Sequence, residues 1–341
     1  MRVLVTGGAG YIGSVVIEAL LDAGHDVVAF DDLSTGHRDA VVAPARLVEG
    51  DLLDARAVTA ALRTHRIEAV VHMAARSLVG DSVADPAGYY RANVTAGLTL
   101  LEAVRAAEVG RLVFSSSAAV YGEPASQPID EGDPPLPKNP YGDTKLAFER
   151  ALRWYHTAYR LRSTSLRYFN AAGATGRSGE RHARETHLVP LVLQAAAGTR
   201  EAITIYGDDY PTPDGTCLRD YVHVSDLALA HVQALDALAR VDGAEVYNLG
   251  LGGAGTSVRE VIDVARRVTG REIAVRVAPR RRGDPARLVA STERIRLALG
   301  WAPRHPALEE IVESAWRWMR GSRDMGGARR TPQPPHAPRP E

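Results

Sequence analysis

A glycine-rich turn near the N-terminus places the strongest constraint on what this chain can fold into. Residues 2–6 (RVLVT) have the apolar run of a buried strand, and Gly7, Gly10 and Gly13 follow at once, before helical apolar spacing over residues 14–23. Gly8, Gly10 and Gly13 also satisfy G-x-G-x-x-G. Glycine permits the tight turn and lets the backbone approach a pyrophosphate at the helix N-terminus. Because the motif lies between a strand and a helix, it predicts a dinucleotide-binding βαβ unit. The alternative is an ordinary βαβ packing turn.

Acidic residues follow the next two strand-like segments. Residues 26–30 lead into Asp31 and Asp32. Asp31 stands near the position expected for a carboxylate that binds the adenosine ribose hydroxyls, which favours NAD because a 2′-phosphate would be repelled. Asp51 follows residues 46–49 and could contact the adenine or merely cap the next helix.

Strands and helices continue to alternate along the first half of the chain. We expect further strands at 69–73, 112–114 and 163–167, and helices at 55–64, 85–108 and 141–159. Alternation of this kind predicts an α/β fold, a Rossmann-type doubly wound parallel sheet. We therefore expect an NAD-binding domain over residues 1–169, joined by parts of 222–250.

The second half of the chain has a different pattern. Residues 171–186 are glycine-rich and irregular, and strands are expected at 202–206, 219–224, 245–249 and 273–277, with helices at 188–197, 225–239, 258–269, 292–299 and 307–320. This pattern predicts a smaller C-terminal α/β substrate-binding domain over residues 170–320. The Arg-, Gly- and Pro-rich tail at 321–341 is expected to be disordered.

The segment NPYGDTK at 139–145 carries the candidate chemistry. Asn139 suits a helix cap and Pro140 a first helical position, so Tyr141 and Lys145 would project from one face. A nearby cation favours the phenolate and lowers the pKa of a tyrosine, so the pair could form a base near pH 7. Ser117, at the end of the 112–114 strand, is a plausible third group. The alternative is a helix surface with one aromatic residue and one solvated lysine.

Charge and cysteine content narrow the class of protein. Of the 341 residues, 41 are Lys or Arg and 41 are Asp or Glu, so the formal net charge is zero, which suggests no nucleic-acid or membrane surface. The single cysteine, Cys217, excludes an internal disulfide framework, and a cytoplasmic protein is expected. His182 and His187 have no supporting cysteine or carboxylate spacing, so no metal is expected.

Several segments along the chain resemble those of a known family. The matching segments are MRVLVTGGAGYIGS at 1–14, VEGDL at 48–52, FSSSAAVYGEP at 114–124, NPYGDTK at 139–145, RYFNAAGA at 167–174, YGDDYPTPDGTCLRDYVHVSDLA at 206–228, YNLG at 247–250 and PRRRGDPARL at 279–288. The chain is similar over roughly residues 1–320 to the UDP-glucose (UDP-galactose) 4-epimerases, which are extended short-chain dehydrogenases/reductases.

The resemblance implies an isomerase that interconverts UDP-galactose and UDP-glucose. NAD would stay bound as a prosthetic group, take hydride from C4 of the sugar and return it to the other face of a transient 4-keto sugar. Tyr141 would be the base, Lys145 would hold the nicotinamide ribose, and Ser117 would hydrogen-bond the reacting oxygen. A homodimer through helices 85–108 and 140–159 is also implied.

The glycine motif, its acidic partners and the resemblance together give two sets of binding residues. The cofactor set is Gly7, Gly10, Tyr11, Ile12, Gly13, Asp31, Asp32, Asp51, Leu52, Met73, Ala74, Ala75, Asn93, Ser115, Tyr141, Lys145 and Tyr168. The UDP-sugar set is Ser117, Tyr141, Asn170, His187, Leu188, Tyr206, Arg219, Arg281, Asp284 and Leu288. Arg219 and Arg281 suit a diphosphate, since the guanidinium fork fits phosphate oxygens.

A few positions depart from the family pattern. Ser77 stands where a lysine is frequent, Asp32 where asparagine is common, and His187 where an asparagine lies near the uracil site. Leu288 occupies the position where a bulky tyrosine excludes N-acetyl sugars, so UDP-GlcNAc/UDP-GalNAc interconversion stays open.

Rival functions differ in the chemistry they need. A sugar 4,6-dehydratase needs an acid and a base just after the catalytic hydroxyl, where Ala118 and Ala119 stand. A UDP-glucuronate 4-epimerase, the alternative enzyme, would have to hold a C6 carboxylate, for which Arg184 and Arg287 are the candidate partners. A catalytically inactive NAD-binding regulator is the alternative from another class, and retention of the serine, tyrosine and lysine argues against it.

Overall fold

A seven-stranded parallel sheet forms the centre of the molecule. The structure is a computed structural model that describes residues 1–124, 126–281 and 284–327. The strand order is β11-β6-β5-β4-β1-β2-β3, and every pairing in it is parallel. The strands are β1 (Arg2–Thr6), β2 (Asp26–Asp31), β3 (Arg46–Glu49), β4 (Ala69–His72), β5 (Arg111–Ser117), β6 (Arg162–Tyr168) and β11 (Ala244–Leu249). The Rossmann-type fold class expected from the sequence is confirmed.

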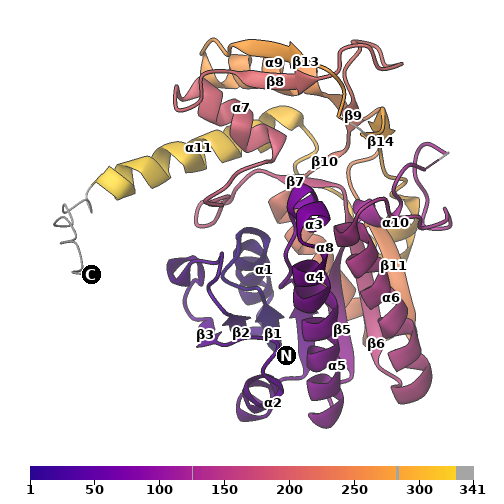
Figure 1. Cartoon of the computed structure of the whole chain (residues 1–341). Coiled ribbons are helices and arrows are strands. Elements are labelled where there is room, and N and C mark those ends of the chain that lie inside the picture. The colour runs from indigo at the N-terminus through magenta and orange to yellow at the C-terminus, as the bar shows by residue number, and fades with distance from the viewer. Residues whose placement is uncertain (125, 282–283, 328–341) are drawn as a thin grey trace, which may run out of the picture.

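Helices cover both faces of this sheet (Figure 1). Helices α1 (Tyr11–Asp22), α8 (Val224–Ala237) and α10 (Glu293–Leu299) pack on one face, and α2 (Ala55–Thr64), α5 (Ala96–Ala106) and α6 (Pro140–Tyr159) on the other. Apolar side chains alternate along each strand between the two faces: Val3 and Val5 of β1 belong to the first core, and Leu4 belongs to the second. Burial of both faces explains why the strands are nearly continuous apolar runs.

The helix expected over residues 85–108 is interrupted. It begins as α4 (Pro86–Tyr89), capped by Asp85, whose carboxylate accepts the Gly88 N–H at 2.9 Å. A π-helical segment, η2 (Tyr90–Thr95), then joins it to α5. Short pieces complete this half: α3 (Val79–Ala84), η1 (Arg38–Ala40) and η3 (Ala118–Val120). Among the residues that the structure describes, no helix is both long and apolar enough to span a membrane.

A second, smaller set of elements lies above the carboxyl ends of the sheet (Figure 1). Its strands are β7 (Asn170–Ala172), β8 (Ile203–Tyr206), β9 (Leu218–Arg219), β10 (Tyr221–His223), β12 (Thr256–Ser257), β13 (Val275–Ala278) and β14 (Arg287–Leu288). Its helices are α7 (Leu188–Ala196), α9 (Val258–Thr269) and α11 (Leu308–Gly327), and the three share a separate apolar core.

Two expectations about this half are wrong. The single strand expected at 219–224 is two short strands in different sheets, with Asp220 between them. The Asp220 carboxylate is buried there and accepts N–H groups from Leu251, Gly252 and Ala290. Helix α11 continues to Gly327 and so includes the start of the segment that was expected to be disordered. The rest of that tail, 328–341, lies outside the described residues.

Candidate active site

A cavity of about 1440 Å³ lies at the carboxyl ends of the parallel strands, and residues from both halves of the chain line it. Gly7 and Gly10 line one end, Tyr141 and Lys145 the middle, and Arg219 the other end. Ligands of open α/β sheets bind outside the carboxyl ends of the strands. The cavity is therefore the candidate active site.

The glycine turn leaves no room for side chains. Gly7 adopts φ +69°, and a Cβ there would lie 2.6 Å from the Ala74 nitrogen. A Cβ on Gly13 would lie 2.1 Å from the Gly7 carbonyl oxygen. Helix α1 begins after Gly10 and has no side-chain cap. Its N-terminus therefore lines the cavity as a bare, positively polarised surface that fits a pyrophosphate.

Asp31 is held in place at the end of β2. Its two carboxylate oxygens accept N–H groups from Ala9 and Leu33, each at 2.9 Å, and it lines the cavity. Burial raises the pKa of this carboxyl group, and the two backbone hydrogen bonds oppose the shift. Asp32 and Asp51 also line the cavity, and each accepts a backbone N–H two residues further on. The residues present fit an adenosine ribose and a dinucleotide pyrophosphate.

Most of the expected cofactor residues line this cavity, and one does not. Those that do are Gly7, Gly10, Tyr11, Ile12, Gly13, Asp31, Asp32, Asp51, Leu52, Met73, Ala74, Ala75, Ser115, Tyr141, Lys145 and Tyr168. Asn93 is absent from the lining. Its amide accepts the Arg76 N–H at 2.8 Å and donates to the Arg76 carbonyl and to Thr144 Oγ1, each at 3.0 Å. Asn93 therefore fixes the loop after β4 against α6.

The tyrosine and lysine lie at the start of α6, where the sequence predicts them. Asn139 caps the helix by accepting the Gly142 N–H at 2.9 Å. Lys145 Nζ donates to the Ser115 carbonyl oxygen at 2.7 Å and lies 5.8 Å from the Tyr141 ring centroid. Ser117, at the end of β5, accepts the Ala119 N–H at 3.1 Å and lies near enough to the phenol to lower its pKa. The three expected catalytic side chains therefore meet in the cavity.

The pKa of Tyr141 is not lowered as the spacing predicts. Burial raises the pKa of the phenol, and the nearby Ser117 side chain offsets only part of that rise. Burial also lowers the pKa of Lys145 to about 7, against an opposing effect of Glu149. Burial therefore makes Lys145 a weaker source of positive charge than an exposed lysine. The protein alone therefore keeps Tyr141 neutral, and a further positive charge in the cavity is needed to make it a base.

A buried network behind the catalytic residues was missed from the sequence. Glu149 accepts two hydrogen bonds from Arg167, at 2.6 and 3.0 Å, and one from Ser116 Oγ at 2.6 Å. Arg167 also donates to the Tyr121 hydroxyl at 2.7 Å. The only available signal was that Glu149 follows Lys145 by one helical turn. The network ties α6 to β5 and β6 directly behind the cavity.

The other end of the cavity is built by β9 and β14. Arg219 forms an ion pair with Asp284 and donates to the carbonyl oxygens of Leu218 and Pro285, at 2.8 and 3.0 Å. Leu288 pairs with Arg219 in the parallel ladder. The expected substrate residues that line the cavity are Ser117, Tyr141, Asn170, His187, Arg219, Asp284 and Leu288.

Three expected substrate residues do not line it. Leu188 packs at the edge of the apolar core formed by α7, α9 and α11. Tyr206 is 38% exposed, and the Arg281 guanidinium lies over its ring, 3.8 Å from the centroid. Arg281 precedes residues 282–283, which lie outside the described residues.

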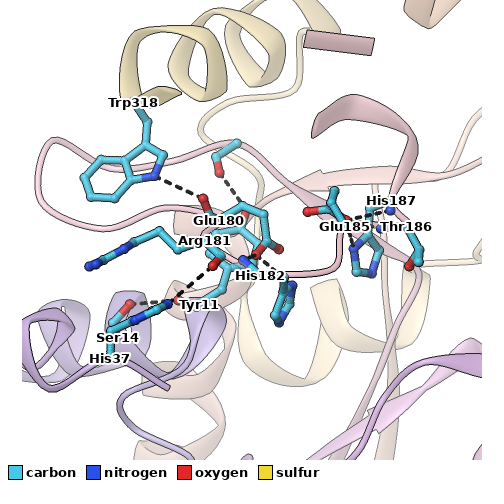
Figure 2. Close-up of polar contacts among 11 residues, drawn as sticks. Tyr11, Ser14, His37, Glu180, Arg181, His182, Glu185, Thr186, His187 and Trp318 are labelled. Carbon is cyan, nitrogen blue, oxygen red and sulfur yellow. Dashed lines mark hydrogen bonds and ion pairs between the residues drawn. The ribbon is translucent and has the colours of Figure 1, made fainter. Parts of the chain in front are cut away.

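The two histidines at 182 and 187 do have carboxylate partners, contrary to expectation. Nδ1 of each lies 2.7 Å from a carboxylate oxygen, that of Glu180 for His182 and that of Glu185 for His187 (Figure 2). Residues 171–186 have no periodic pattern from which this convergence could be predicted.

Comparison with known proteins places this cavity in context. Residues 3–250 match the NAD dependent epimerase/dehydratase family. The chain is 54% identical over 316 residues to a UDP-glucose 4-epimerase of Corynebacterium glutamicum, covering 93% of this chain and 95% of that protein.

Solved structures agree with the sequence comparison. A UDP-glucose 4-epimerase from Brucella ovis in complex with NAD superposes with a TM-score of 0.90 at 46% identity, covering 93% of this chain and 98% of that one. A UDP-glucose 4-epimerase from Bifidobacterium longum in complex with NAD⁺ and UDP gives a TM-score of 0.89 at 36% identity, covering 95% and 99%.

Proposed function

This chain belongs to the NAD dependent epimerase/dehydratase family, and from that premise we propose how its cavity carries out the epimerisation of a UDP-hexose at C4. The enzyme is an NAD-dependent isomerase that interconverts UDP-galactose and UDP-glucose. The observation that carries the assignment to this cavity is the meeting of Ser117, Tyr141 and Lys145 between the glycine turn and the Arg219–Asp284 pair. One end of the cavity fits a dinucleotide, and the other fits a diphosphate.

NAD would lie along the glycine turn, with its pyrophosphate at the N-terminus of α1 and its adenosine ribose on Asp31. When bound, it supplies the redox chemistry, because it takes a hydride from C4 of the sugar and returns one. Lys145 would hold the nicotinamide ribose, since its ammonium is fixed by the Ser115 carbonyl oxygen at the end of β5. Asn93 would act indirectly on cofactor binding, because it fixes the backbone of the loop at Arg76.

Tyr141 would remove the proton of the sugar 4-hydroxyl. Its phenol is neutral in the protein alone, so the positive charge of oxidised nicotinamide beside it would lower its pKa to the range a base needs. Ser117 donates or accepts at the same oxygen and can pass the proton in either direction. Since the reaction ends with a proton returned to the sugar, the pair must work both ways.

The substrate would be held by its nucleotide while the sugar stays free to turn. Arg219, fixed by Asp284, would bind the diphosphate. Arg281 would join it from its position over Tyr206, and Asn170, which lines the cavity, would complete the nucleotide end. Near the reacting hydroxyl stand Ala118 and Ala119, whose small side chains leave room for a rotating hexose. Leu288 lines the same space and sets how large a C2 substituent can be accepted.

The uronic acid alternative has less support. Arg184 lines the cavity, but its guanidinium donates to Asp81 at 3.0 Å. Arg287 is absent from the cavity lining, and its carbonyl oxygen accepts from Gln127 at 3.1 Å. A C6 carboxylate would therefore compete with an existing ion pair.

We also propose that the enzyme is a cytoplasmic homodimer of two-domain subunits, with residues 1–169 and parts of 222–250 as one domain and 170–320 as the other. Exposed apolar side chains on α5 and α6 support the dimer. Trp154 is 72% and Tyr159 is 54% exposed on α6, and Leu98 is 39% exposed on α5. Exposed aromatic residues gathered on neighbouring helices are typical of a subunit interface.

The test of this function is incubation of the pure protein with UDP-galactose without added NAD. We expect UDP-glucose to form, because NAD should be retained through purification. UDP-GalNAc and UDP-galacturonate are assayed in parallel, and products are separated by chromatography. Turnover of UDP-galacturonate alone, or bound NAD without turnover of any of the three, would refute the proposal.

A further inference from the structure

The segment between β7 and α7 crosses one side of the cavity and carries a cluster of metal-type ligands. We call residues 173–187 the strap. Glu180, His182, Glu185 and His187 all belong to it, and all four line the cavity. One donor atom from each of them lies within 4.8 Å of the other three. Figure 2 shows the side chains close together on this segment.

The four side chains form two carboxylate–imidazole pairs that face each other. The rings of His182 and His187 are stacked, with centroids 6.0 Å apart and 28° between their planes. The Glu185 side chain is only 5% exposed, and that of Glu180 is 13% exposed. Each carboxylate acts electrostatically on the histidine of the other pair as well as on its own partner. The two pairs therefore form one charged unit.

Two carboxylates and two imidazoles are a donor set for a borderline transition metal ion. Zn²⁺ takes nitrogen and carboxylate oxygen ligands at about 2.0–2.2 Å, usually four of them in a tetrahedron. Two neutral imidazoles and two carboxylates carry a formal charge of −2, which one divalent ion neutralises. The four donor atoms lie within 4.8 Å of one another, so they must move closer together to coordinate a central ion. Rotation of the four side chains would bring about this movement.

The backbone between the ligands is fixed on both sides of the cavity. Arg181 forms an ion pair with Asp39 at 2.9 Å, and its carbonyl oxygen lies 3.3 Å from His37 Nε2. The Trp318 indole donates to the Glu180 carbonyl oxygen at 3.3 Å (Figure 2). At the start of the strap, the Tyr11 hydroxyl donates to the Gly173 carbonyl oxygen at 2.6 Å. The ligands are therefore presented by a loop that is already anchored, which lowers the ordering cost of binding.

From this arrangement we propose that Glu180, His182, Glu185 and His187 form a binding site for one divalent transition metal ion, with Zn²⁺ as the probe. The ion links the two halves of the strap beside the cavity. Mg²⁺ should bind this site poorly, because that ion prefers oxygen ligands in octahedral geometry.

The test is zinc binding to the full-length protein without a polyhistidine tag. Isothermal titration calorimetry and metal analysis after dialysis should give one zinc per chain, and Mg²⁺ should give no binding heat. Titration with Co²⁺ should give the visible absorption of a four-coordinate ion. UDP-sugars are left out, since diphosphates chelate metals themselves.

Two variants locate the ion. His182→Ala and Glu180→Gln should each weaken zinc binding by at least about 10-fold, because losing a ligand costs at least as much as losing a residue that supports one. His305→Ala is the matched control, since Nδ1 of His305 lies 3.5 Å from a Glu310 oxygen in a second histidine–glutamate pair outside the strap. This control should bind zinc as the parent does.

Either of two results would overturn the proposal. The first is a tag-free parent that takes up no zinc in the calorimeter and gives no four-coordinate Co²⁺ spectrum. The second is zinc binding to the parent, His182→Ala and Glu180→Gln with equal affinity, which would place the ion elsewhere. Circular dichroism and the amount of copurified NAD show whether each variant is folded. If one of the two variants does not fold, the other still tests the site.

Discussion

The ammonium group of Lys145 donates a 2.7 Å hydrogen bond to the backbone carbonyl oxygen of Ser115. This bond joins the first turns of α6 to the end of β5, and it holds Nζ of Lys145 5.8 Å from the centroid of the Tyr141 ring. The lysine is thus positioned by main chain as well as by its helix. The orientation of the whole catalytic group depends on how α6 sits against β5.

Tyr141→Phe removes the proposed base and leaves the ring in place. We expect kcat for UDP-galactose to fall by about 100- to 10,000-fold, the range for loss of a positioned acid–base group. NAD should copurify as in the parent. Tyr159→Phe, at the exposed end of the same helix, is the control and should keep the parent rate. A near-normal rate for the Tyr141 variant would exclude it as the base.

Glu149→Gln leaves the Arg167 charge buried without its counterion. Both side chains are almost fully buried, so we expect the free energy of unfolding to fall by about 3–5 kcal/mol, as when one partner of a buried pair is removed. Urea unfolding measures this. Glu102→Gln breaks an exposed pair with Arg105 and should cost less than about 1 kcal/mol. Similar losses in the free energy of unfolding for the two variants would show that the buried pair stabilises the fold no more than the exposed pair does.

Leu288→Tyr narrows the cavity beside β14. We expect kcat/KM for UDP-GlcNAc to fall at least about 5-fold more than kcat/KM for UDP-glucose, because one extra contact of this size is worth at least about 1 kcal/mol. Leu297→Tyr, at a position 79% exposed on α10, is the control for a leucine-to-tyrosine change. An equal loss on both substrates would remove Leu288 as a size filter.

His231 makes the fold sensitive to acid. Its Nδ1–H donates to the Leu227 carbonyl oxygen at 2.8 Å, and Tyr168 donates to its Nε2, so it is buried as the neutral form. Burial lowers its pKa to about 4, against 6.5 for the ordinary side chain. Between these values the unfolded chain binds a proton that the folded chain does not. The stability supplied by the neutral form is therefore fully present above pH 6.5 and is lost as the pH falls towards 4.

The slope of that loss is the measurable quantity. We expect His231 to contribute a fall of about 1.4 kcal/mol in the free energy of unfolding for each pH unit below 6.5. Urea unfolding at several pH values should show a shallower slope for His231→Gln than for the parent. Equal slopes for the two proteins would show that His231 does not cause the loss of stability in acid.

The first half of the fold was predictable because its signals are local. The glycine turn, the cap at Asn139 and the proline at 140 each specify geometry within a few residues, and the strand and helix bounds followed from them. The meeting of Ser117 with Tyr141 was predictable too, since the carboxyl ends of parallel strands share one edge of the sheet.

What could not be predicted depends on distant contacts. The pairing of Glu149 with Arg167 needs α6 to pack on β6, and the local sequence around either residue does not report that contact. The raised pKa of Tyr141 is a consequence of burial, which the spacing of tyrosine and lysine does not report. The cluster on the strap arises from an irregular loop, and the role of Asn93 appears only when its partners at Arg76 and Thr144 are known.

The position of β11 governs the order in which the molecule can be assembled. It pairs with β6, Ser163 opposite Ala244, after the chain has passed through β7 to β10 and α8. On the ribosome, β6 therefore emerges long before its neighbour, and a chain that stopped at Phe169 would present an open strand edge and an uncovered apolar face. Such edges pair readily with other chains. We therefore expect that the two halves of this enzyme do not fold separately, and that cutting between them yields aggregates instead of an isolated nucleotide-binding domain.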